Sequence, residues 1–155
     1  MILVSSCLAG LKVRYNGTDC LHNKIKKLVE ENKAMTVCPE LLGGFSTPRE
    51  PAEIVGGSGE DVLNEKAKVI TVSGEDVTGQ YIKGAYETLK IAQEVGALLV
   101  VLKENSPSCG SAMIYNGTFK GEKIAGSGVT AALLQQNGIK VVSEENIFEM
   151  IKEID

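Results

Sequence analysis

The sequence has no tryptophan, one histidine and three phenylalanines among its 155 residues. With so few aromatic side chains, the core must be built from Val, Ile, Leu and Ala. A histidine-rich zinc site and a Cys-His-Asp hydrolase would both have to depend on His22 alone. Because His22 stands at the start of an expected helix, we interpret it as an ordinary helix-start residue rather than as a ligand or a base.

An excess of positive charge is also missing. Sixteen Lys and Arg residues stand against 20 Asp and Glu residues, which gives a formal charge of −4. A protein with this balance lacks the basic surface that binds a long phosphate backbone, so a polynucleotide partner is disfavoured and a small-molecule ligand is favoured. A local basic pocket containing Lys12, Arg14 and Arg49 can still favour a single anion.

No apolar run is long enough to span a bilayer, so we expect no membrane partner. The first seven residues have neither the basic start nor the apolar core of a signal peptide. We therefore expect a cytoplasmic protein, in which thiols are kept reduced. Its four cysteines are then expected to be reduced, catalytic or metal-bound rather than paired in disulfides.

Nucleotide-binding fingerprints are absent as well. No G-x-x-x-x-G-K occurs, and no G-x-G-x-x-G follows an expected strand, which excludes a P-loop and a dinucleotide-binding fold of the usual kind. The run from Gly126 to Thr130 opens an expected helix, whose N–H groups could hold an anion. A plain helix start explains this run at least as well.

What the sequence does contain is an alternation of short β-branched runs with helical ones. The expected strands are residues 2–5, 35–38, 68–72, 97–102 and 139–142, and the expected helices are residues 22–32, 78–95, 129–136 and 144–154. The run from Ala97 to Leu102 is the most apolar, so it is expected at the centre of the sheet. This pattern predicts a three-layer, Rossmann-like α/β fold with a mainly parallel sheet, and residues 1–155 are predicted to form one domain.

Three of the four cysteines occupy equivalent positions in this pattern. Cys7 follows the first expected strand, Cys38 ends the second, and Cys109 lies in the loop after the central one. The loops beyond the carboxyl ends of parallel strands share one edge of the sheet, so we expect the three thiols to meet there. Thiolates are soft ligands, and the set therefore predicts a metal centre, with an iron–sulfur cluster as its expected form. Cys20 precedes a helix and is interpreted as a spare residue.

The residues around these cysteines support a reactive site. Glu40 lies two residues beyond Cys38, and Ser106 and Ser108 stand close before Cys109. Glycines in the same loops let the backbone approach a bulky inorganic group and donate N–H groups to its sulfurs. Arg14 and Arg49 are candidates for orienting a polar substrate, although solvated loop charges would look the same.

Several blocks of the sequence together resemble one family. These are Cys7 to Gly10, Val13 to Gly17, Cys38 to Glu40 with Gly43-Gly44 and Pro48-Arg49, Gly74 to Thr78, Lys103 to Gly110, and Tyr115 to Phe119. They resemble the thiouracil desulfidase family, long treated as a domain of unknown function, in its single-domain form. The resemblance covers nearly the whole chain.

The resemblance implies a four-iron, four-sulfur cluster held by only three cysteines, Cys7, Cys38 and Cys109, with one iron left open. It implies that Glu40 and Ser106 act in catalysis, and we assign Arg14, Arg49 and Ser108 to substrate binding. The implied reaction removes sulfur from a thiolated uracil base, nucleoside or nucleotide, converting C=S to C=O with water and without net electron transfer.

Two other functions remain open from the residues alone. The three cysteines could hold zinc or another metal for a hydrolase, or the chain could be a non-catalytic sulfur carrier or nucleotide-binding module with ordinary thiols.

Overall fold

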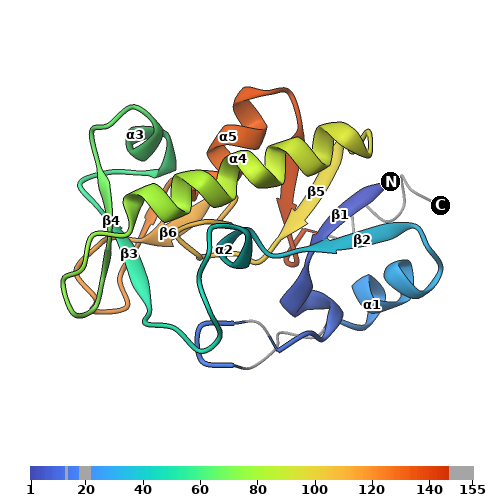
Figure 1. The fold of residues 1–155 in the computed structure, drawn as a ribbon, viewed down its shortest axis with the longest axis horizontal. Helices are drawn as coiled ribbons and strands as arrows, with labels where there is room; N and C mark the ends of the chain where they lie inside the picture. The colour runs from blue at the N-terminus through green and yellow to red at the C-terminus, as the bar shows by residue number, and fades with distance from the viewer. Residues whose placement is uncertain (13, 18–21, 147–155) are drawn as a thin grey trace.

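The computed structural model describes residues 1–12, 14–17 and 22–146 (Figure 1). Within them, a parallel sheet has the strand order β2-β1-β5-β8. Its strands are β1 (Ile2–Ser5), β2 (Ala34–Val37), β5 (Leu99–Leu102) and β8 (Lys140–Ser143). In this order β1 is paired on one side with β2 and on the other with β5.

Alternate residues of the parallel strands point to opposite faces and build two cores. Leu3, Val100 and Leu102 belong to the larger core, which includes residues of helices α4 (Thr78–Glu94) and α5 (Val129–Gln136). Val4 and Val101 belong to the smaller core, against helix α1 (Asn23–Glu30). Figure 1 shows α4 and α5 on one side of the sheet and α1 on the other.

The predicted α/β architecture with a parallel sheet between helical layers is therefore confirmed. The helix expected over residues 144–154 is not tested as a whole: residues 144–146 form a turn after β8, and the rest lie outside the described residues. No helix in the described ranges combines the length and the apolar character needed to cross a membrane.

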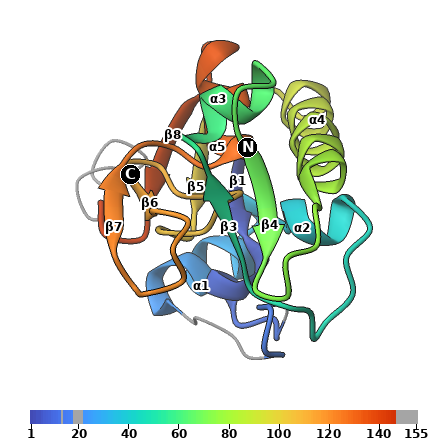
Figure 2. The same ribbon diagram turned by 90° about the vertical axis from the view of Figure 1, so that its left-hand side faces the viewer.

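Two small antiparallel sheets add to this core. One joins β3 (Ala52–Val55) to β4 (Lys68–Thr71), and the other joins β6 (Met113–Tyr115) to β7 (Lys123–Ala125). Figure 2 shows β3, β4 and β7 in front of the parallel strands. The strand expected at residues 68–72 exists, but it pairs with β3 instead of joining the parallel sheet.

Short elements complete the described chain. They are η1 (Ser6–Ala9), α2 (Pro39–Leu42) and α3 (Gly59–Leu63). The sequence predicted a loop from Pro39 to Pro51, but the first four residues of this range form helix α2, so that part of the prediction is wrong. Pro39 occupies the first turn of α2, where its missing N–H costs nothing because that N–H would have no partner within the helix.

Helix α2 packs directly against α4 through glycine. A Cβ atom at Gly84 of α4 would collide with the carbonyl oxygen of Pro39, and one at Gly43 would collide with the carbonyl oxygen of Gln80. The two backbones can approach this closely only because neither glycine carries a side chain. This contact fixes the position of Cys38 and Glu40, which flank Pro39.

We expect Gly84→Ala to destabilise the protein by about 1–3 kcal/mol, because the new methyl group must push α2 away from α4. Gly79→Ala in the same helix is the matched control. No atom lies within 4 Å of a Cβ built at Gly79, so that substitution should be neutral or stabilise by up to about 1 kcal/mol. Thermal and denaturant unfolding measure both effects, and equal stability changes in the two variants would contradict the prediction.

Candidate active site

A cavity of about 380 Å³ lies at the carboxyl edge of the parallel sheet. Cys7, Cys38 and Cys109 all line it, together with side chains from α2, β3 and β6. The other ionisable residues on its wall are Arg14, Tyr15, Glu40, Arg49, Glu50, Glu53, Tyr81, Lys103, Glu104 and Tyr115. Cations and carboxylates thus share a cavity of a size that suits a small molecule.

Neighbouring strands bring the three cysteines to this cavity. Cys7 lies in η1 immediately after β1, Cys38 directly follows β2, and Cys109 lies in the loop after β5. Because β1 pairs in parallel with both β2 and β5, the three chain ends emerge side by side. All three residues are thiols rather than disulfides. The structure therefore brings together the thiols that the sequence grouped, and their role as ligands stays a prediction.

Two of these cysteines, Cys38 and Cys109, lie in a setting that opposes ionisation of their thiols. Cys109 is 4% exposed, and burial raises its pKa well above the ordinary value, as do the nearby negative charges of Glu40 and Cys38. Burial also raises the pKa of Cys38. Thiolates in this cavity therefore need a cation beside them. Among the described residues, no three His, Cys, Asp or Glu side chains converge closely enough to hold one single ion.

The loop that carries Cys109 is held by its own serine and by α5. Ser106 Oγ accepts hydrogen bonds from the N–H groups of Ser108, at 3.1 Å, and Cys109, at 3.2 Å. The carbonyl oxygens of Pro107 and Ser108 accept hydrogen bonds from the first N–H groups of α5, those of Val129 and Thr130. These donors therefore bind the loop, which corrects the suggestion that the start of this helix holds an anion.

Gly128, the residue before α5, allows this contact between loop and helix. A Cβ atom there would lie 2.5 Å from the carbonyl carbon of Ser108 and 2.8 Å from the nitrogen of Cys109. Any side chain at this position would displace the peptide that precedes the thiol. The Cys109 loop thus depends on backbone contact with the helix start.

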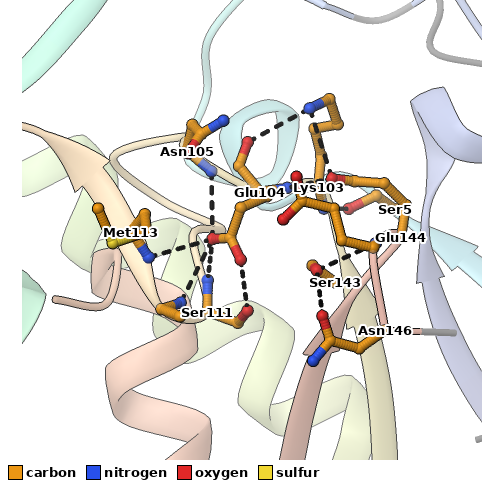
Figure 3. A network of polar contacts seen from close by, with 11 residues as sticks. Ser5, Lys103, Glu104, Asn105, Ser111, Met113, Ser143, Glu144 and Asn146 are labelled. Atoms are coloured by element: carbon orange, nitrogen blue, oxygen red, sulfur yellow. Dashed lines mark hydrogen bonds and ion pairs between the residues drawn. The ribbon is translucent and has the colours of Figure 1, made fainter. Parts of the chain in front are cut away.

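Glu104 organises the other side of the same loop (Figure 3). Its carboxylate accepts hydrogen bonds from the Ser111 N–H, at 2.7 Å, and the Ser111 hydroxyl, at 2.8 Å. The N–H groups of Asn105, Ala112 and Met113 donate to it as well. Although burial alone would raise the pKa of Glu104, these hydrogen bonds outweigh it and lower that pKa from 4.5. The ionised carboxylate therefore closes the loop between Asn105 and Met113.

Lys103 and Glu144 connect this cluster to the neighbouring strands. The Glu104 N–H donates to the Glu144 carboxylate at 3.1 Å, and Lys103 Nζ lies 3.6 Å from the same group. The Lys103 N–H donates to Ser5 Oγ at 3.0 Å. Figure 3 shows these contacts around the ends of β1, β5 and β8, so the strand ends that carry Cys7 and Cys109 are fixed to each other.

We expect Glu104→Gln to destabilise the protein by about 1–3 kcal/mol near neutral pH, since the charged acceptor of several hydrogen bonds is lost. The lowered pKa means that this stabilisation is complete above pH 4.5 and disappears as pH falls through the lower, folded-state value. The difference in free energy of unfolding between wild type and variant should therefore become smaller below pH 4.5. Denaturant unfolding at several pH values measures this difference.

Glu122→Gln is the control for this experiment. Glu122 is exposed and accepts one hydrogen bond from the Asn116 side chain, at 2.9 Å. Its replacement should have little effect at any pH. A Glu104→Gln variant as stable as this control would show that the carboxylate does not hold the loop.

Glu40 stands two residues beyond Cys38, and its charge helps to raise the pKa of both Cys38 and Cys109. Its Oε2 accepts hydrogen bonds from Arg49 Nε, at 3.1 Å, and from the Tyr81 hydroxyl, at 3.2 Å. The side chains of Arg49 and Glu40 are only 7% and 16% exposed. Burial, followed by the charge of Glu40, raises the pKa of Tyr81 well above 10, so this hydroxyl stays protonated and donates. Oε1 has no hydrogen-bond partner among the described residues.

The predicted substrate-binding residues divide into two groups. Arg14 and Arg49 line the cavity, although Arg49 is held against Glu40. Ser108 is 1% exposed and is not part of the cavity wall, and its hydroxyl lies 2.8 Å from that of Thr130. The assignment of Ser108 to substrate binding is therefore at odds with its position. His22 precedes α1 and does not line the cavity, as expected of a helix-start residue.

Sequence reasoning missed several residues of the wall. Glu53, Tyr81 and Lys103 line the cavity without having been singled out as site residues. Tyr81 lies in the first turn of α4, and nothing in its local sequence indicates that it reaches the cavity. Glu53 lies in a strand of only four residues between Pro51 and Gly56, which is too short for its alternation to be recognised.

The fold and the cavity define a class: an α/β protein with three thiols and a carboxylate gathered at the carboxyl edge of a parallel sheet. Comparison with known proteins identifies the family within this class. The sequence model of the 2-thiouracil desulfurase family matches residues 2–146, and the chain belongs to that family. The resemblance drawn from the sequence blocks is thereby confirmed.

Two relatives illustrate the membership. The protein YbbK of Bacillus subtilis (strain 168) is 64% identical over 151 residues, which cover 97% of this chain and 100% of YbbK. The solved structure of the [4Fe-4S]-dependent thiouracil desulfidase TudS superposes with a TM-score of 0.86 at 42% identity, over 99% of this chain and 96% of that one.

Proposed function

We propose that this protein converts the C=S group of a thiolated uracil base, nucleoside or nucleotide to C=O with water, using a [4Fe-4S] cluster bound by Cys7, Cys38 and Cys109. The observation that carries the proposal is the cavity itself, in which three thiols and the Glu40 carboxylate share one wall. Family membership and the [4Fe-4S]-dependent TudS support it.

The residues present fit such a cluster. All three cysteines are thiols and come from adjacent strand ends, and burial makes the anions of Cys38 and Cys109 dependent on a nearby cation. They surround a cavity without meeting at one point, whereas zinc requires its ligands about 2.3 Å from a single centre. Three thiolates leave one iron of a four-iron cluster without a protein ligand.

When bound, the cluster supplies a Lewis-acidic iron that attracts the soft thiocarbonyl sulfur and makes the attached carbon more electrophilic. Glu40 is the group that handles the proton of the attacking water. Arg49 and Tyr81 hold its Oε2 in place, which leaves Oε1 available to accept that proton. Arg49 thus serves to position Glu40 in addition to lining the cavity.

Ser106 is suited to donate a hydrogen bond to the substrate. Its oxygen already accepts two backbone N–H groups, and among the described residues its own O–H has no acceptor. The hydroxyl proton therefore remains available for the developing negative charge on the substrate. Arg14, on the same cavity wall, supplies a positive charge for a polar or anionic substituent of the substrate.

The reaction balances without an electron carrier. Water contributes its oxygen to the ring carbon, the C–S bond breaks, and the sulfur leaves at the oxidation level of sulfide. The protons of water are shared between Glu40, sulfide and solvent. No flavin or nicotinamide is required, in agreement with a sequence that lacks a dinucleotide fingerprint.

Anaerobic reconstitution with iron and sulfide tests the proposal. We expect brown protein with the absorption of a [4Fe-4S] cluster and release of sulfide from 2- or 4-thiouracil. Cys7→Ser, Cys38→Ser and Cys109→Ser should each lose most of the bound iron and all measurable activity. Cys20→Ser is the control, because the sequence predicts no ligand role for it, and it should keep both.

Glu40→Gln separates catalysis from cluster binding. This variant should bind iron and sulfide as wild type does, while kcat falls by roughly 100-fold or more because the proton acceptor is lost. Zinc bound in place of iron, with no acid-labile sulfide, would favour a metal hydrolase instead. Full function after Cys7→Ser would point to a non-catalytic module.

A further inference from the structure

Glu53 presents a carboxylate to the cavity from the wall that belongs to the small sheets. It lies in β3 and is 9% exposed. Its Oε1 accepts hydrogen bonds from the N–H of Gly117, at 2.9 Å, and the N–H of Phe119, at 3.2 Å. Both donors belong to the turn that joins β6 to β7, a segment drawn beside β3 in Figure 2. One oxygen of this nearly buried side chain is thus fixed by the backbone.

The second oxygen of Glu53 has no such partner. No donor of the described residues bonds to Oε2, and this atom is not sealed in the interior. Because Glu53 lines the cavity and Oε2 is not fully buried, this oxygen is available to a molecule bound there. A nearly buried carboxylate that bonds through one oxygen only is costly unless water or a ligand supplies the missing donor.

Glu53 differs in this respect from the other acidic residues of the wall. Both oxygens of Glu104 are occupied by the Cys109 loop. Glu50 is exposed, and its Oε2 accepts the hydroxyl of Ser73 at 2.8 Å. Glu40 also has an open oxygen, but it stands two residues beyond Cys38 and is held by Arg49 and Tyr81. Glu53 therefore stands out as an acceptor on the wall formed by β3 and the β6–β7 turn.

We propose that Glu53 Oε2 accepts the ring N3–H of the substrate and thereby selects uracil-type rings. This inference rests on the function proposed above. In a uracil ring N3 lies between C2 and C4, so its N–H is adjacent to the sulfur-bearing carbon in both 2-thio and 4-thio compounds. N3–H also persists in nucleosides and nucleotides, where the sugar occupies N1.

The same contact excludes other rings. A cytosine-type ring has a lone pair at N3, which a carboxylate oxygen repels, and an N3-alkylated ring has no hydrogen to offer. A site built to bond a substrate N–H rejects an analogue that lacks it strongly, because the buried acceptor is then left without a partner. Glu53 is thus a specificity-determining residue, distinct from the proton acceptor Glu40.

Glu53→Gln changes this contact without removing the side chain. The N–H groups of Gly117 and Phe119 require an oxygen at the Oε1 position, so the amide oxygen should occupy it. The NH₂ group then replaces Oε2 and presents a donor where the substrate needs an acceptor. The turn between β6 and β7 keeps both of its hydrogen bonds, so the variant is expected to fold.

The experiment compares 4-thiouridine with 3-methyl-4-thiouridine on the reconstituted enzyme. In these nucleosides N1 is blocked, so only the first has a ring N–H. We expect wild type to prefer 4-thiouridine by at least about 10-fold in kcat/KM. Glu53→Gln should lower kcat/KM for 4-thiouridine by roughly 10- to 100-fold, mostly through KM, and bring the preference close to one. Glu50→Gln, the matched control, should keep the wild-type preference.

A purely structural role for Glu53 would give a different result. If Glu53 only anchors the β6–β7 turn, its replacement slows both substrates alike and leaves their ratio unchanged, which would overturn the proposal. Equal kcat/KM of the wild-type enzyme for the two nucleosides would also overturn the proposal, and this measurement requires no variant.

Product binding keeps the test independent of turnover. Calorimetric titration of wild-type protein with uridine and with 3-methyluridine should show uridine binding at least about 10-fold more tightly. Glu53→Gln should remove that difference. Absence of desulfuration by wild type, with the uridine preference intact, would refute the proposed function and leave the role of Glu53 standing. Desulfuration without any N3–H preference would support the proposed function and refute the role of Glu53.

Discussion

Parallel pairing of β1 with both β2 and β5 is the constraint on which the whole site depends. It places the residues after three strands at one edge, although Cys7, Cys38 and Cys109 are widely separated in sequence. The carboxyl end of a parallel sheet is a place where side chains from different loops converge without long excursions of the chain. Here it gathers thiols on a rigid frame, since Lys103 and Ser5 also join the ends of β1 and β5.

The cavity concentrates groups that repel one another when ionised. Three thiols, Glu40 and Glu53 share its wall with Arg14, Arg49 and Lys103. Each carboxylate is stabilised locally, Glu40 by Arg49 and Tyr81 and Glu53 by two backbone N–H groups. Burial raises the pKa of both Cys38 and Cys109, and the charge of Glu40 raises both further, although Arg49 partly offsets this at Cys38. A cationic group bound beside these two cysteines would therefore stabilise their thiolates.

The sequence predicted the elements of the parallel sheet because long, periodic or strongly apolar segments form them. The strand at Leu99–Leu102 and the helix at Thr78–Glu94 are of this kind. β7 could not be predicted, since it has three residues, all exposed, and therefore no hydrophobic alternation. Helix α3 did carry a readable signal, the capping box between Ser58 and Asp61, which has a Ser-x-x-Asp spacing.

The site was predictable to the extent that it follows strand ends and motif blocks. The cysteines, Glu40 and Ser106 all reach the cavity. Ser108 does not line the cavity, because neighbouring residues in a tight loop point in different directions and its hydroxyl meets that of Thr130. Glu53 and Tyr81 reach the cavity only through tertiary packing, which no local sequence pattern indicates. Glu53 depends on the contact of β3 with the β6–β7 turn, and Tyr81 on the contact of α4 with α2.

The contact between the Cys109 loop and α5 has a thermodynamic consequence. The first N–H groups of α5 donate to the carbonyl oxygens of Pro107 and Ser108, so the helix start cannot fray without releasing the loop. Anything that holds Cys109 in place must then also suppress opening of this helix, and linkage makes the effect reciprocal. Amide hydrogen exchange at Val129 and Thr130 would accordingly report occupancy of a cavity that neither residue lines.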